Sequence, residues 1–179
     1  MPRPERMKNF PRRKSLRLPE YEYSSAGAYF ITLCCNNRRC LFGDNIDAQV
    51  RLNPLGEICG EAWREIPDHF SAVELDEYVI MPNHLHGILL IKDERARHAS
   101  PLQPQGNDLP KLGHVVASFK SVVSRRIRRL PGSAELKIWQ RNYYEHVIRN
   151  NVSLNEIRTY IANNPPNWAE DQLNPAYIS

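Results

Sequence analysis

The chain of 179 residues lacks any long apolar run. Its longest uninterrupted apolar stretch, Gly87–Ile91, is far shorter than the roughly 20 residues that cross a bilayer as a helix. The opening sequence "MPRPERMKNFPRRKSLRLPE" has no apolar core of the kind found in secretory signals. We therefore expect a cytoplasmic protein without a membrane segment.

Cysteine is also scarce, and its spacing argues against a structural zinc site. The four cysteines are Cys34, Cys35, Cys40 and Cys59, and none forms the C-x-x-C pair that is typical of zinc ligands. Cys34 and Cys35 are adjacent, so on a strand they point to opposite faces of the sheet. Reduced thiols are the expectation for a cytoplasmic chain.

Charge is nearly balanced but unevenly distributed. The chain has 24 Lys and Arg against 20 Asp and Glu, a net charge of +4. Basic residues crowd the first segment of the chain and the later stretch "FKSVVSRRIRRL". Two basic segments favour contact with a polyanion. The alternative is a solvated tail and a solvated helix face, and charge alone does not decide between them.

Hydrophobic periodicity predicts alternating strands and helices. Apolar runs predict strands in "GAYFITLCC", "AVELDEYVIMP" and "HLHGILLI". Helical spacing of apolar residues predicts three helices, over 53–70, 112–130 and 153–165. In the last of these, Ser153 and Glu156 form a candidate capping box, and Pro165 ends the helix.

These elements predict an α+β fold with one antiparallel sheet and helices packed on one face, because the strands are too few for a barrel. Residues 1–25 form a basic arm with little periodicity, and 26–179 form one domain. The segment 93–111 is rich in Pro, Gln and charge, which predicts a mobile surface loop.

Two histidines interrupt the apolar strand "HLHGILLI". Side chains alternate along a strand, so His84 and His86 project to one face while Leu85 points to the other. Two neighbouring imidazoles can bind one divalent ion with little rearrangement. Alternatively, they are ordinary polar residues near a strand end, bonded to the backbone.

Tyr160 and Asn164 are candidate partners of the histidine pair. They lie four residues apart in the third predicted helix, hence on one helical face. The Asn164 carbonyl oxygen is a hard ligand suited to Mg²⁺ or Mn²⁺. The Tyr160 phenol becomes a nucleophile once it loses its proton. The alternative role for Tyr160 is that of a core aromatic beside Ile157 and Ile161.

Several motifs in order resemble one known family. The segments "YVIMPNHLHGILLI", "FKSVVSRRIRR", "IWQRNYYEHVIRN" and "YIANNPPNW" resemble the REP-associated tyrosine transposases, relatives of the single-tyrosine HUH transposases. The segment "GAYFITLCCNNRRCLFG" resembles the first strand of that family. The resemblance covers roughly 26–171. An H-x-H motif alone would be weak evidence, whereas several motifs in the right order are specific.

The resemblance implies a fold, a mechanism and a substrate. The fold would be a ferredoxin-like sandwich. His84, His86 and Asn164 would hold Mg²⁺ or Mn²⁺, and Tyr160 would attack the scissile phosphate, leaving a 5′-phosphotyrosine and a free 3′-hydroxyl. The substrate would be single-stranded or hairpin DNA of the REP type. Family members act as monomers or homodimers, so the oligomeric state stays open.

The same resemblance implies a function for the basic residues. They would contact DNA phosphates, and such contacts add affinity but no sequence specificity. The candidates are Lys120, Arg125, Arg126, Arg128 and Arg129 in the predicted helix, and Arg12 and Arg13 in the arm. Tyr143 and Tyr144, beside a "WQ" motif, are expected to have a supporting role.

Two rival functions follow from the same residues. The first is a hairpin-binding regulator that has lost catalysis, which the presence of all four site residues argues against. The second is a metal-dependent hydrolase of small molecules. A hydrolase would usually need an acidic group near the histidines, and none follows "HLHG" until Asp93. A hydrolase also leaves the basic arm unexplained.

Overall fold

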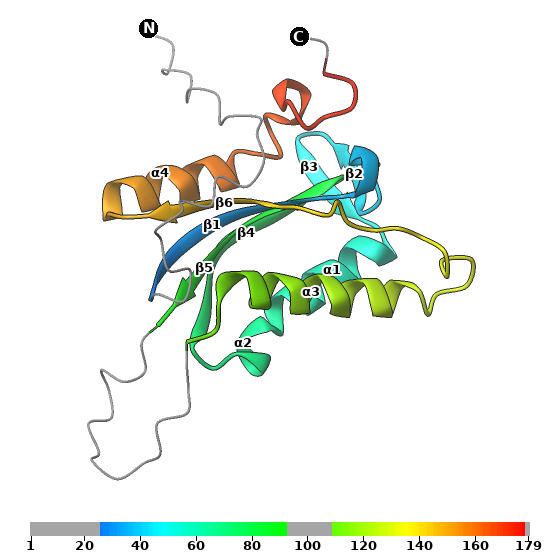
Figure 1. Cartoon of the computed structure of the whole chain (residues 1–179). Coiled ribbons are helices and arrows are strands. Elements are labelled where there is room, and N and C mark those ends of the chain that lie inside the picture. The colour runs from blue at the N-terminus through cyan, green and yellow to red at the C-terminus, as the bar shows by residue number, and fades with distance from the viewer. Residues whose placement is uncertain (1–25, 93–108, 178–179) are drawn as a thin grey trace, which may run out of the picture.

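A four-stranded antiparallel sheet forms the centre of the molecule (Figure 1). The computed structural model describes residues 26–92 and 109–177. The strands are β1 (Gly27–Cys34), β4 (Val73–Met81), β5 (His84–Ile91) and β6 (Tyr144–Ile148), in the order β4-β5-β1-β6. Every neighbouring pair runs antiparallel, and a bulge interrupts the β4–β5 register between Leu75 and Tyr78.

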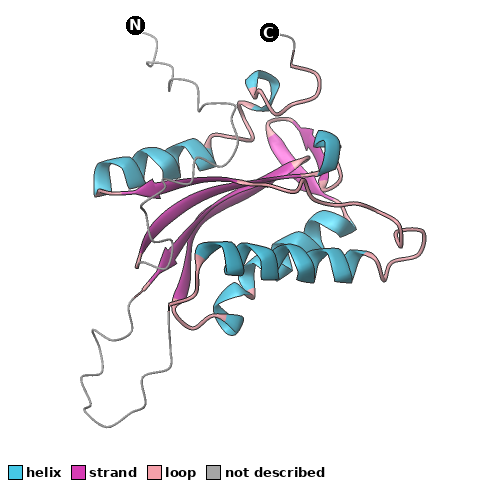
Figure 2. Cartoon of the chain, viewed as in Figure 1, coloured by secondary structure: helices cyan, strands magenta, loops and turns pink. Residues whose placement is uncertain are grey.

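Helices lie on both sides of this sheet (Figure 2). They are α1 (Pro54–Arg64), α2 (Ile66–His69), α3 (Leu112–Ile127) and α4 (Asn151–Ala162), with short 3-10 turns at Asn36–Arg38 and Trp168–Glu170. The larger core cluster joins α1 and α3 to the sheet residues Tyr29, Ile31 and Leu33. The smaller cluster joins α4 to Phe30 and Ile88, which face the other way.

The predicted α+β, ferredoxin-like fold is confirmed by the order of the elements. The sheet strands and the helices that cross between them follow the pattern β1-α1-β4-β5-α3-β6, which is the ferredoxin-like arrangement. The expectation that helices pack on one face holds for α1 and α3. The expectation is wrong for α4, because its residues Ile157 and Ile161 pack on the opposite face of the sheet.

Local boundaries differ from the sequence-based expectations in two helices. The predicted helix over 53–70 divides into α1 and α2 around Glu65. α4 begins at Asn151, before the expected cap at Ser153, because the Asn150 side chain accepts a hydrogen bond from the Ser153 backbone nitrogen. The arm at 1–25 and most of the predicted loop, 93–108, lie outside the described residues.

A hairpin that the sequence did not reveal precedes α1. It consists of β2 (Gly43–Ile46) and β3 (Gln49–Leu52). Its tip residues Asp47 and Ala48 have φ values of 51° and 61°, as a two-residue hairpin turn requires. Glycine usually marks such a turn in a sequence, and here neither tip residue is glycine, so the usual signal is missing.

One glycine of β5 explains how the histidine strand packs. Gly87 follows His86 and therefore faces α1, where a Cβ atom would meet the Trp63 indole. Trp63 is fully buried, so its ring fills the space that a side chain at position 87 would need. The packing of α1 thus requires glycine next to the histidine pair. None of the helices in the described part of the chain is long and apolar enough to cross a membrane.

Candidate active site

The two histidines of β5 lie side by side on the face that α4 covers. Their ring centroids are 4.4 Å apart, and the exposed fractions are 0% for His84 and 2% for His86. The Tyr160 hydroxyl oxygen from α4 lies 3.3 Å from Nε2 of His86. The structure therefore brings together the strand motif and the helix tyrosine that the sequence suggested.

A chain of hydrogen bonds determines which nitrogen of His84 carries the proton. The Asn83 amide nitrogen donates to the carbonyl oxygens of Arg38 and Leu173, at 3.1 and 2.7 Å, so its oxygen must face away from them. That oxygen lies 2.8 Å from Nδ1 of His84 and can only accept. Nδ1 of His84 is therefore protonated, and Nε2 has a free lone pair.

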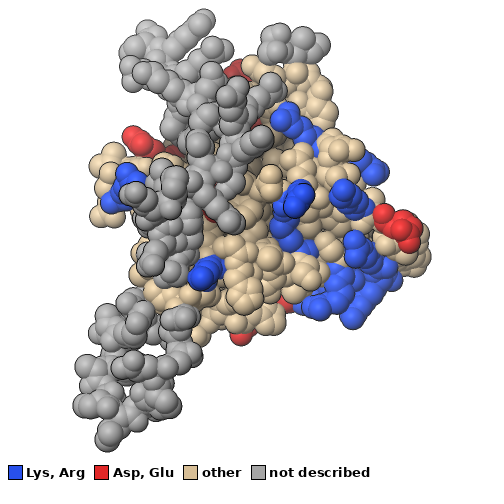
Figure 3. Space-filling model, in the orientation of Figure 1, with Lys and Arg blue, Asp and Glu red and all other residues tan. Residues whose placement is uncertain are grey.

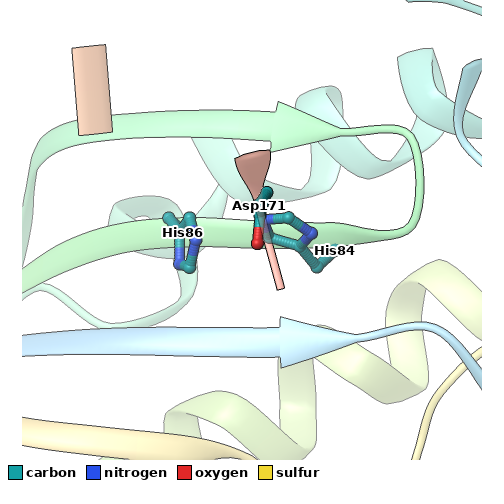
Figure 4. Close-up of side chains that lie close together, drawn as sticks. All are labelled: His84, His86 and Asp171. Atoms are coloured by element: carbon teal, nitrogen blue, oxygen red, sulfur yellow. The ribbon is translucent and has the colours of Figure 1, made fainter. Parts of the chain in front are cut away.

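Asp171 lies beside this lone pair (Figure 4), and no motif in the sequence points to it. Its Oδ2 is 3.7 Å from Nε2 of His84, and both atoms are buried without a hydrogen-bond partner among the described residues. His84, His86 and Asp171 form a cluster whose ligand atoms all lie within 4.8 Å of one another. The sequence-based argument against a hydrolase, that no acidic group follows "HLHG" until Asp93, is therefore weakened, because Asp171 places a carboxylate beside the histidines.

Asn164 adds a further acceptor. Its side chain is buried, and its Oδ1 has no hydrogen-bond partner within 26–92 or 109–177. Asn164 lies close enough to His84 and Tyr160 to affect the pKa of both. Nε2 of His84, Oδ2 of Asp171 and Oδ1 of Asn164 are thus buried acceptors without a partner among the described residues, and a cation between them would offset the cost of burying them. The donor set therefore fits a metal ion.

The protonation states also suit metal binding. Burial, and then the neighbouring His86, lower the pKa of His84 far below its usual value, and burial lowers the pKa of His86 to about 3. Both imidazoles are thus neutral at pH 7, as metal ligands must be. Thr32 Oγ1 lies 2.8 Å from Nδ1 of His86 and holds that ring in place.

Tyr160 is protonated in this environment. Burial, followed by the Asp171 carboxylate, raises the pKa of its phenol to about 12. A nearby cation would offset both effects, because it stabilises the phenolate and compensates the carboxylate. The phenol is therefore a poor nucleophile until the cluster holds positive charge.

The segment after α4 covers the histidine pair. The Trp168 ring lies 6.0 Å from the His84 ring, between centroids, at an interplanar angle of 36°. The Arg38 guanidinium donates to the carbonyl oxygen of Gln172 at 3.2 Å. These contacts, with the Asn83 bond to Leu173, hold Asp171 over the site.

Four of the predicted DNA-binding cations share one open pocket. Lys120, Arg125, Arg128 and Arg129 line it together with Trp139 and Arg141. Figure 3 shows Lys and Arg gathered on the side of the molecule where α3 ends. Lys120 Nζ donates to the Gln140 carbonyl oxygen at 2.7 Å, which ties α3 to the segment before β6.

Arg126 differs from its neighbours. Its guanidinium donates to both carboxylate oxygens of Glu65, at 3.0 and 2.6 Å, and it does not line the basic pocket. Arg12 and Arg13 lie outside the described residues. The four cysteines are free thiols, as expected.

Comparison with known proteins gives one clear relative. The chain is 45% identical over 168 residues to an uncharacterized protein of Haemophilus influenzae, covering 90% of this chain and 92% of the relative. The chain belongs to the family of this protein. No family model matches the sequence.

A solved structure shares the fold. It is a REP-associated tyrosine transposase bound to a REP hairpin, 20% identical to this chain with a TM-score of 0.58. The match covers 85% of this chain and 74% of the transposase. At this identity the likeness shows the fold alone, and the fold agrees with the one that the sequence motifs implied.

Proposed function

We propose that this protein is a metal-dependent single-stranded DNA endonuclease and strand transferase, which cleaves at DNA hairpins through a 5′-phosphotyrosine. The observation that carries the proposal is the 3.3 Å approach of the Tyr160 hydroxyl to His86, beside a buried set of unpaired acceptors. The transposase-like fold supports a DNA-processing role, and the neighbour's REP hairpin suggests the class of substrate.

The residues that would hold the ion are His84, His86, Asp171 and Asn164. Neutral imidazole, carboxylate and amide oxygen together suit Mg²⁺ or Mn²⁺. Bound there, the ion would supply a Lewis acid that offsets the charge on the scissile phosphate. Asp171 extends the ligand set that the family resemblance implied.

The covalent step uses Tyr160. Its hydroxyl loses a proton, and the oxygen forms a bond to phosphorus while the bond from phosphorus to the 3′-oxygen breaks. The 3′-oxygen leaves and takes up one proton from solvent, which balances the proton that Tyr160 gave up to solvent. Because a phosphodiester is kept, a DNA 3′-hydroxyl can later attack the phosphotyrosine and restore a DNA strand.

The basic pocket would hold the DNA during this step. Lys120, Arg125, Arg128 and Arg129 would contact phosphates, and Arg12 and Arg13 of the arm would add to this attraction. Arg126 is less suited, since Glu65 already binds both of its terminal nitrogens. Such contacts position the hairpin without reading its sequence.

The test is a cleavage assay on a 3′-labelled oligonucleotide that folds into a REP-type hairpin with single-stranded flanks. With Mn²⁺, the wild type should form a labelled protein–DNA adduct, and EDTA or Tyr160→Phe should abolish it. Tyr78→Phe is the matched control, since the Tyr78 hydroxyl accepts a hydrogen bond from Arg64, outside the site.

Other outcomes separate the rivals. An adduct formed equally by Tyr160→Phe would remove Tyr160 from its role. Hairpin binding by the wild type without any adduct would favour a regulator that has lost catalysis. If the wild type neither binds the hairpin nor forms an adduct, a small-molecule hydrolase would be the better explanation of the metal cluster.

A further inference from the structure

A second tyrosine hydroxyl approaches the site from β6. In the sheet register Tyr144 pairs with Thr32, and Thr32 pairs with His86. Residues that pair across neighbouring strands share a face, so Tyr144 lies on the face of the histidine pair. Two strand spacings, about 10 Å, separate its Cα from that of His86, and the Phe30 ring lies between the two side chains in contact with both.

Phe30 holds the aromatic rings of the site together. Its ring stacks on His86 with centroids 5.4 Å apart, and it meets Tyr144 and Tyr160 edge-on at 6.2 and 6.0 Å. One buried apolar ring thus positions the metal-ligand histidine and both tyrosines. Tyr144 and Tyr160 are both partly buried against the same small core cluster.

Tyr144 and Tyr160 interact electrostatically. Burial and Asp171 raise the pKa of Tyr160 most, and Tyr144 adds a smaller increase. The adjacent Tyr143 is different, because it packs against the larger core cluster on the opposite face of the sheet. Only one of the two consecutive tyrosines therefore reaches the site.

We propose that Tyr144 is a further catalytic residue, whose hydroxyl donates a hydrogen bond to the phosphate that Tyr160 attacks. This inference rests on the proposed function. The attacked phosphate has two non-bridging oxygens, and an ion held by His84, His86 and Asp171 would bind one of them. Tyr144 approaches from β6, the edge strand on the far side of β1, and can serve the second oxygen.

The chemistry of the side chain supports this role. Burial raises the pKa of Tyr144, so its hydroxyl stays protonated and remains a donor. A hydrogen bond to a charged group is stronger than one between neutral groups, and such a bond to the phosphate strengthens as charge builds in the transition state. Tyr144 forms and breaks no covalent bond in this step.

The experiment compares Tyr144→Phe with Tyr143→Phe on the same 3′-labelled hairpin with Mn²⁺. Tyr144→Phe should lower the single-turnover rate of adduct formation by about 10- to 100-fold. Its hairpin affinity and Tm should stay close to the wild-type values, because the ring and its packing on Phe30 are kept. Tyr143→Phe should cleave at nearly the wild-type rate.

The outcomes distinguish this inference from the proposed function. If the wild type forms no adduct, the proposed function fails. If the wild type forms an adduct and Tyr144→Phe forms it equally fast, only the role of Tyr144 fails. An adduct that persists in Tyr160→Phe and disappears in the double variant would make Tyr144 the nucleophile and overturn the hydrogen-bonding role.

Discussion

The hydroxyl oxygen of Tyr160 lies 3.3 Å from Nε2 of His86, although 74 positions separate the two residues in the chain. β5 presents the imidazole, and α4, which packs on the same face of the sheet, presents the phenol. Asp171 then arrives from the segment after α4 and lies beside His84. The site therefore depends on how α4 and the following segment are held against the sheet.

Asp171→Asn should weaken Mn²⁺ binding and stabilise the metal-free protein. The carboxylate faces the lone pair of His84, whereas an asparagine amide could donate a hydrogen bond to it. A hydrogen bond gained at a buried acceptor contributes about 1 kcal/mol. We expect a higher Tm than wild type in EDTA and a smaller rise in Tm when Mn²⁺ is added. A lower Tm in EDTA would contradict the inference that the Asp171 carboxylate and the His84 lone pair face each other as two acceptors.

Gly87→Ala should destabilise the fold. A Cβ atom there would lie 2.8 Å from Cη2 of Trp63, and the indole is fully buried. Overpacking of this kind costs about 1–3 kcal/mol. Urea unfolding measures the loss. Gly27→Ala in β1 is the matched control, because its Cβ would meet Tyr29 at an ordinary 3.6 Å. Equal stabilities of the two variants would refute the packing argument.

Asp76→Asn should loosen α4 from the sheet in a pH-dependent way. Nε and Nη2 of Arg158 on α4 donate to the two oxygens of Asp76 on β4, at 2.8 and 2.5 Å. These bonds lower the pKa of Asp76 below 3.8. Their contribution is therefore present above pH 3.8 and is lost as the pH falls through the lower folded-state pKa.

The Tm of Asp76→Asn should accordingly lie below the wild-type Tm at neutral pH and approach it in acid. Thermal unfolding followed from neutral to acidic pH measures the difference. Glu77→Gln is the control, because the exposed Glu77 acts on Arg158 through its charge alone and makes no side-chain hydrogen bond to it. A difference that persists unchanged in acid would show that the Asp76 charge is unimportant.

The basic pocket predicts a salt effect. Arg125→Ala with Arg129→Ala should reduce the slope of log affinity against log salt by about 1.4 to 1.8 for the REP-type hairpin, since each lost phosphate contact removes about 0.7 to 0.9. Arg126→Gln should leave the slope nearly unchanged, because Glu65 binds that side chain. Fluorescence anisotropy over a salt series measures both. A larger change in slope for Arg126→Gln than for the double variant would show that the DNA binds at Arg126 and not at the basic pocket.

The sequence predicted the fold class because its signals were local. Alternation placed His84 and His86 on one face of a strand, and helical spacing placed Tyr160 and Asn164 together. It missed the β2–β3 hairpin, whose turn residues Asp47 and Ala48 adopt positive φ without being glycine. It also put every helix on one face, because an apolar stripe shows that a helix is covered but not which face of the sheet covers it.

Asp171 marks the limit of such reasoning. No spacing rule connects a carboxylate after a proline-rich turn to a histidine on β5, and only the path of the chain after α4 brings them together. Likewise, Tyr143 and Tyr144 are identical in type and adjacent in sequence, and only the register of β6 with β1 assigns Tyr144 to the site. The sequence by itself determined the strand, helix and side-chain chemistry, since these follow from neighbours along the chain. The tertiary structure alone decided which distant acceptors meet, because strand register and helix docking are settled by packing between remote segments.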